Sequence, residues 1–261
     1  MTIRLHYIIF ALAALTGVAV RSAMLIFTID PASGFFRAEY TYSAIGFIIF
    51  LTCAGLAVFV SALLLPTTTR KAVTIDGIPF CAAAVLMAAA IVYETFFSSI
   101  LSTVPIFQQT LHYAVSAAAV ASLLYISFCK FLKKEFPPII SLAPILFWGM
   151  RLIVVFTGFS TISAISDTVI ETIGMCLALS TFLFYAKVET MQRSSFQRLY
   201  FAVAMLCSFV SALGSFPRLI ADIFAAEEAI HMTTIPYCTA FATGIFSFIF
   251  AMELFKKIRK Q

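Results

Sequence analysis

The segment FWGMRLIVVF, residues 147–156, places a single arginine, Arg151, in a run of otherwise apolar side chains. Apolar residues continue on both sides, over 137–159, which is enough for a helix that crosses a hydrocarbon core about 30 Å thick. A permanent positive charge at mid-helix costs roughly 2.5–3.5 kcal/mol on insertion scales. Arg151 therefore needs either a partner or a function.

The composition of the whole chain indicates a membrane protein. Of its 261 residues, 62% are hydrophobic and 11% are charged, whereas a soluble domain carries about 25% charged residues. A soluble protein this apolar would have no polar surface to cover its core. The lipid bilayer is therefore the expected partner of the chain, and no basic tract predicts a nucleic-acid partner.

Eight apolar runs predict eight transmembrane helices, because a span needs about 20 mostly apolar residues. Backbone groups in lipid must bond internally, and runs this long favour helices over the short alternating strands of a barrel. The expected fold class is all-α, with one transmembrane domain over 1–261. The runs cover 5–27, 43–64, 78–97, 105–129, 137–159, 167–187, 199–220 and 234–255.

The distribution of Lys and Arg predicts the orientation. Most of the 17 basic residues lie in alternate loops or at the two ends, including KKIRK at 256–260. Basic loops face the cytoplasm, so we expect a multi-pass protein of the cell membrane with both termini cytoplasmic. A cleaved signal peptide over the first run would leave seven spans, but the length of the run and the nearby Arg21 favour a retained helix.

A weak internal similarity suggests two halves, 1–134 and 137–261. A shift of 124 residues places the third and fourth runs on the seventh and eighth, with Tyr113 on Tyr237. Four helices per half would make the halves parallel repeats, related by an axis along the membrane normal. The alternative is chance similarity between apolar helices.

Polar side chains gather in the outer half of the expected spans. At about 1.5 Å per residue, Arg151 lies roughly 21 Å from the cytoplasmic end of its helix, and Glu94 roughly 24 Å from the end of its own. Glu94 and Glu171 are the expected ion-pair partners of Arg151, and such pairs could simply hold helices together. The candidate binding residues are Arg21, Glu94, Gln108, His112, Tyr113, Arg151, Glu171, Arg218 and Tyr237.

As a group, these residues favour an anionic ligand. Three guanidiniums against two carboxylates leave one positive charge in excess, and arginine binds carboxylate or phosphate bidentately. His112 could add a proton-linked step, although a helix-packing role is the simpler interpretation. The small-residue runs at 82–90 and 114–122 predict that the third and fourth helices form a tight inner pair.

The sequence favours transport over catalysis. The six cysteines form no CxxC pair and no Cys/His cluster, so no metal or cofactor is expected. No nucleotide-binding or hydrolase motif is present either. The favoured function is a secondary transporter or permease with an outward-facing site for a small anionic solute.

Two other functions fit the same sequence. One is a non-catalytic membrane subunit or receptor-like sensor that works with a membrane protein partner, with its charges paired and dry. The other is an intramembrane enzyme acting on lipid phosphates, for which the candidate carboxylates are Asp222, Glu227 and Glu228.

Overall fold

The computed structural model describes residues 2–28, 38–65, 75, 77–97, 105–158, 165–190, 197–224 and 237–260. Within these ranges, the chain forms eight helices that are long and apolar enough to cross a membrane, which confirms the predicted all-helical, eight-span architecture. The helices are α1 (Ile3–Phe27), α2 (Thr41–Leu63), α3 (Ile78–Phe97), α4 (Ile106–Phe131), α5 (Ala143–Gly158), α6 (Ile165–Glu189), α7 (Gln197–Phe224) and α8 (Cys238–Lys260).

The fifth span differs from the single helix expected over 137–159. It begins as a short 3-10 helix, η3 (Pro138–Leu142), and continues as α5. Proline has no backbone N–H and favours the first turn of a helix, so Pro137 and Pro138 account for this entry. A second 3-10 turn, η1 (Ala38–Tyr40), precedes α2.

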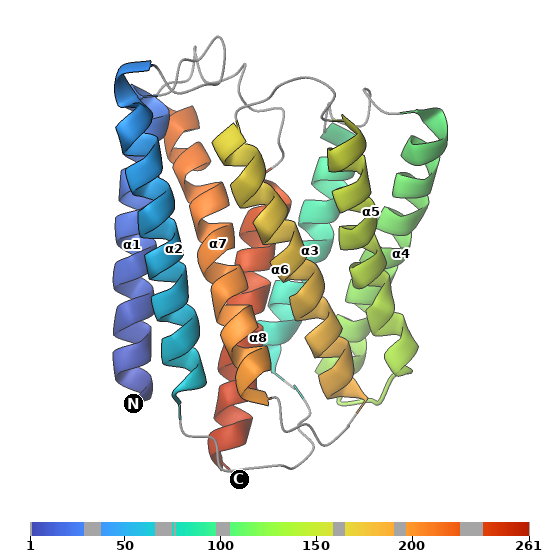
Figure 1. Ribbon diagram of the computed structural model, residues 1–261. Coiled ribbons are helices and arrows are strands. Elements are labelled where there is room, and N and C mark those ends of the chain that lie inside the picture. The colour runs from blue at the N-terminus through green and yellow to red at the C-terminus, as the bar shows by residue number, and fades with distance from the viewer. Residues whose placement is uncertain are drawn as a thin grey trace.

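The helices run alternately up and down, so both termini lie at the same end of the bundle (Figure 1). Helices α1 and α2 form one edge and α4 and α5 the other, with α3, α6, α7 and α8 between them. The most extensive contact joins α7 and α8, and the next joins α3 and α4. The arrangement as two repeats, and the orientation relative to a membrane, remain predictions.

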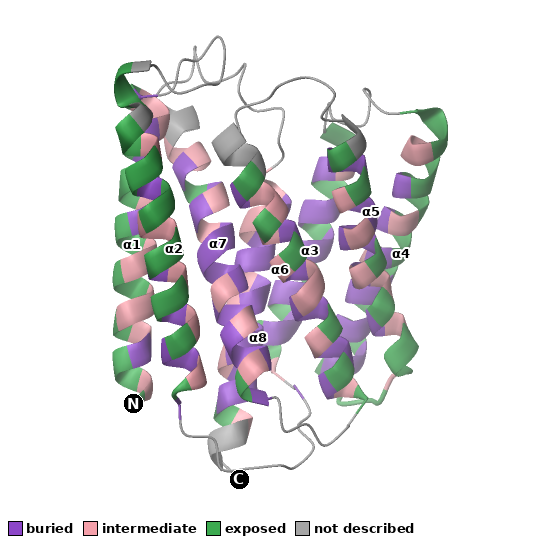
Figure 2. Ribbon diagram, viewed as in Figure 1, coloured by how far each residue is buried: buried purple, intermediate pink, exposed green. Residues whose placement is uncertain are grey.

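Burial is concentrated on α3, α7 and α8, as Figure 2 shows. The expected inner pair is therefore only half right: α3 is central and packs on α4, but α4 lies at the edge and exposes Ala114, Ala117 and Ala118. The true inner pair is α7 and α8. A Cβ on Gly244 would lie 3.1 Å from the Cβ of Ser211, so the two helices approach closely there.

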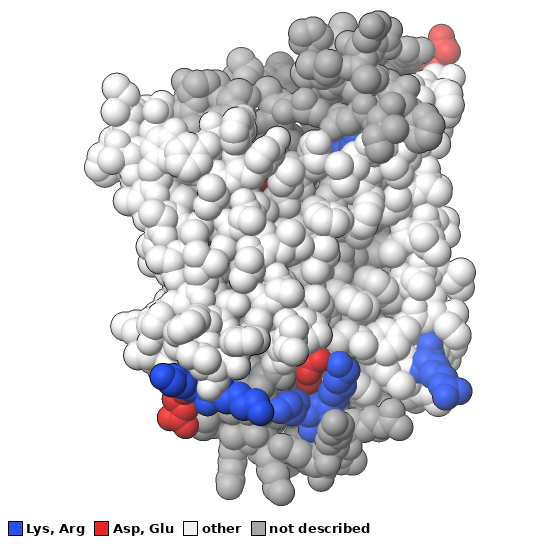
Figure 3. All heavy atoms as spheres, turned by 180° about the vertical axis from the view of Figure 1, so that it is seen from behind, with Lys and Arg blue, Asp and Glu red and all other residues white. Residues whose placement is uncertain are grey.

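Described Lys and Arg side chains gather at the end that carries the termini (Figure 3). Some charged groups at this end are buried as well. Lys130 Nζ lies 2.7 Å from Glu189 Oε2, with both side chains 6% exposed, and Glu253 is also buried. His6, near the start of α1, is fully buried, and its Nδ1 lies 2.8 Å from Ser61 Oγ.

Candidate functional site

The nine candidate residues all lie in the half of the bundle opposite the termini. Because neighbouring helices run in opposite directions, late residues of α1, α3, α5 and α7 share this level with early residues of α4, α6 and α8. Each candidate lies within about two helical turns of the helix end at that side. Some of these residues line one cavity, whereas the others lie at the same depth but elsewhere in the bundle.

Arg151 on α5 is buried, and carboxylates neutralise it. Its Nη1 donates to Glu94 Oε2 and to Thr239 Oγ1, each at 2.5 Å, and its Nη2 lies 3.6 Å from Glu171 Oε1. The guanidinium carbon lies 5.4 Å from the centre of the Trp148 ring, one turn earlier on the same helix. The predicted ion pairing of Arg151 is confirmed, with both expected carboxylates involved.

Glu94 on α3 also caps the start of α8. Its Oε1 accepts from the backbone N–H of Thr239 at 2.6 Å, and its Oε2 accepts from the hydroxyl of Thr239 at 2.5 Å. The first N–H groups of a helix have no partner within the helix, and a negative charge there is stabilised by the helix dipole. Glu94, Arg151 and Thr239 therefore form a closed network that ties together α3, α5 and α8.

Glu171 on α6 has a different environment. Both of its carboxylate oxygens are buried, and neither has a hydrogen-bond partner within standard distance among the described residues. Arg151 Nη2 lies 3.6 Å from Glu171 Oε1, and Arg218 on α7 is within electrostatic range. Arg21 on α1 is 1% exposed and lies within electrostatic range of the like-charged Arg218.

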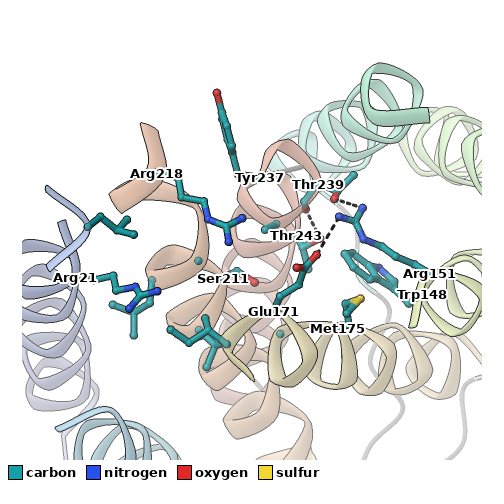
Figure 4. Close-up of a pocket in the computed structure, with 17 residues that line it drawn as sticks. Arg21, Trp148, Arg151, Glu171, Met175, Ser211, Arg218, Tyr237, Thr239 and Thr243 are labelled. Carbon is teal, nitrogen blue, oxygen red and sulfur yellow. Dashed lines mark hydrogen bonds and ion pairs between the residues drawn. The ribbon is translucent and has the colours of Figure 1, made fainter. Parts of the chain in front are cut away.

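These side chains surround a cavity of about 40 Å³ between α1, α5, α6, α7 and α8. A water molecule needs roughly 10–15 Å³ by this measure, so the cavity holds a few waters or a ligand of a few non-hydrogen atoms. Figure 4 shows Arg21, Arg218, Glu171 and Arg151 projecting from four helices toward this space. Five of the nine candidates line it: Arg21, Arg151, Glu171, Arg218 and Tyr237.

The other four candidates lie outside the lining. Glu94 does not touch the cavity, but it accepts hydrogen bonds from Arg151 and Thr239, which line it. His112 is buried on α4, where its Nδ1 lies 3.3 Å from Ser116 Oγ and its ring packs against that of Phe147. These contacts agree with a role in helix packing. Gln108 is half-buried near the start of α4, and Tyr113 is 44% exposed on the outer surface.

Several lining residues were not predicted from the sequence. Trp148 lies under Arg151, and Thr239, Thr243 and Ser211 supply hydroxyls from α8 and α7. Trp148 is the only tryptophan of the chain and lies three residues before the buried arginine, which was a usable signal. Ser and Thr are common in every span, so the hydroxyl groups carried no such signal.

Across the described ranges, no group of three or more His, Cys, Asp or Glu is placed to hold a metal ion. Asp222, Glu227 and Glu228 lie outside the described side chains. No protein-family model, curated protein or solved structure matches this chain.

Proposed function

We propose that this protein is a membrane transporter or permease whose cavity binds a small anionic solute from the side opposite its termini. The observation that carries the proposal is the charge around the cavity. Three guanidiniums meet there, on Arg21, Arg151 and Arg218, and two carboxylates, Glu94 and Glu171, oppose them. Arginine binds carboxylate and phosphate groups bidentately, so guanidiniums on the wall of a buried cavity favour a small anion as the ligand.

The depth of the cavity also supports transport. Binding sites of secondary transporters lie inside the bundle, between helices that can move against each other. Here α1, α5, α6, α7 and α8 all contribute to the cavity wall, so its shape depends on how these helices pack. Tyr237 and Thr239 at the start of α8 also line the cavity, and their hydroxyl groups can donate hydrogen bonds to a ligand.

A second candidate, the non-catalytic membrane subunit, is favoured by one observation. Arg151 is neutralised by Glu94 and stacked on Trp148, so this charge alone can be explained as a structural link between helices. The two functions differ in what Arg218 does, because it lines the cavity outside the closed network of Glu94, Arg151 and Thr239.

Binding and flux measurements test the proposal. The purified protein is screened for thermal stabilisation by a panel of small anions, together with Arg218→Gln and the matched control Arg198→Gln, an exposed residue near the other end of α7. We expect at least one anion to stabilise the wild type and the R198Q variant but not the R218Q variant. The same anion should leave preloaded proteoliposomes faster when the wild type is present.

The outcomes separate the candidates. If no anion stabilises the wild type, or if R218Q responds equally, the anion site is wrong. Binding without flux would instead favour a sensor or subunit.

A further inference from the structure

Two side chains on the cavity wall have buried polar atoms that form no hydrogen bond with any described residue. Trp148 on α5 is 3% exposed, and its indole Nε1–H meets no acceptor within the described ranges. Glu171 on α6 buries both carboxylate oxygens, and neither accepts a hydrogen bond of standard length there. A buried donor or acceptor without a partner is destabilising, so each group points to something that completes it.

The polar groups on the α3 and α8 side of the cavity are satisfied by the protein itself. Glu94 accepts from Arg151 and from both the hydroxyl and the backbone N–H of Thr239. Thr243, which also lines the cavity, donates its hydroxyl to the Thr239 carbonyl oxygen at 2.6 Å. The groups that still need partners therefore lie on the α5 and α6 side.

Trp148 and Glu171 both border the Arg151 guanidinium. Its carbon lies 5.4 Å from the centre of the Trp148 ring, and its Nη2 lies 3.6 Å from Glu171 Oε1. Figure 4 shows both side chains at the end of the cavity that holds Arg151, away from Arg21 on α1. A small ligand group at this end can therefore reach both.

A hydroxyl is the ligand group that suits this pair. The indole N–H only donates, and a carboxylate only accepts. A hydroxyl accepts through its oxygen and donates through its proton, so a single hydroxyl can complete both side chains. An ammonium group could donate to Glu171 but has no acceptor for Trp148, and a methyl group offers neither.

We propose that the solute is a small hydroxy acid, whose hydroxyl accepts from Trp148 and donates to Glu171 while its carboxylate faces the arginine side chains of the wall. This inference rests on the anion site proposed above. A cavity of about 40 Å³ admits a ligand of a few non-hydrogen atoms, so the acid is a short one. A site that hydrogen-bonds a hydroxyl discriminates against analogues without it, because its own buried polar groups would stay unpaired.

Glycolate, propanoate and glycine test the proposal, because they are short carboxylates of nearly the same shape. They differ at one position, which carries a hydroxyl, a methyl or an ammonium group. Their affinities are measured by titration calorimetry in the wild type, in Glu171→Met, which removes the acceptors, and in Trp148→Phe, which removes the N–H and keeps a ring. Glu253→Met is the matched control, since it replaces a buried carboxylate near the opposite end of α8.

We expect the wild type and E253M to bind glycolate at least about 10-fold more tightly than propanoate, the effect of one hydrogen bond to a charged group. E171M should lose most of this preference, and W148F should reduce it roughly fivefold, the effect of one neutral hydrogen bond. Propanoate binding by both variants reports that they fold.

A wild type that binds propanoate or glycine as tightly as glycolate overturns the inference. So does a full preference for glycolate in E171M and W148F, or its loss in E253M. These results leave the anion site standing, whereas a wild type that binds none of the three carboxylates removes both the inference and the carboxylate site.

Discussion

Replacing Glu94 with alanine should be the most damaging single change in the outer half of the bundle. The substitution leaves Arg151 buried without its main counter-charge and removes the acceptor for the Thr239 backbone N–H. Breaking a buried ion pair by removing one partner costs about 3–5 kcal/mol. Arg151 keeps Thr239 and the more distant Glu171, so we take the lower end, about 3 kcal/mol, for the charge.

The lost helix cap adds to this cost. Removing a capping side chain costs typically about 1 kcal/mol, so the expected total for Glu94→Ala is roughly 4 kcal/mol. Glu94→Gln keeps an acceptor for Thr239 and loses the charge, and hydrogen bonds to charged groups contribute about 1.5–3 kcal/mol, so this variant should lose about 2 kcal/mol. Arg151→Met should cost less than Glu94→Ala, because Glu94 would retain both bonds from Thr239.

The assay is the free energy of unfolding in lipid–detergent micelles, measured for the single variants and for the Glu94→Ala, Arg151→Met double variant. Because the two side chains are in direct contact, the double variant should be less destabilised than the sum of the singles by about 2 kcal/mol. Glu253→Ala serves as the control, since its partner Lys256 is 53% exposed and such pairs contribute about 1 kcal/mol or less. The reasoning is refuted if Glu94→Ala matches this control, or if the two substitutions are additive.

Three further outcomes follow from the packing. Gly244→Leu should destabilise the protein by about 1–3 kcal/mol, because added atoms meet Ser211 on α7 and overpacking costs this much; a Tm equal to wild type would contradict the close approach of α7 and α8. Lys130→Met should cost about 3 kcal/mol because it strands the buried Glu189, and the Lys130→Met, Glu189→Leu double variant should recover most of that loss; a double variant no more stable than the single would refute the pair. Tyr113→Ala should leave anion-induced stabilisation unchanged, because the side chain lies on the outer surface, and a lost response would show that the cavity extends to α4.

The fold was predictable because the bilayer simplifies the relation between sequence and structure. A span must be helical and about 20 residues long, so hydropathy alone located all eight helices. The entry to the fifth span was less clear, since a proline pair is compatible with both a helix start and a 3-10 turn. The choice of inner helices failed because small residues permit close packing without specifying a partner, as the exposed alanines of α4 show.

The depth of the candidate residues in the bundle was predictable from the sequence, but the direction in which each side chain points was not. Counting residues along each helix gave the depth of Arg151 and Glu94, because the rise per residue is fixed. The rotation of each helix about its axis depends on packing, which explains why Tyr113 faces outward while Arg218 lines the cavity. Lys130 and Glu189 each lie just beyond an apolar run of the sequence, yet α4 and α6 extend far enough to include them, and the two side chains are buried against each other.

The link between Glu94, Arg151 and Thr239 also has a consequence for biogenesis. Ribosomal synthesis delivers Glu94 first, Arg151 57 residues later, and Thr239 a further 88 residues after that. While the nascent chain leaves the insertion machinery, the α3 carboxylate can neutralise the α5 guanidinium as soon as that helix enters the bilayer. The last helix then docks its N-terminal turn on a salt bridge that has already formed, so a chain arrested before α8 should retain its earlier helices in the bilayer.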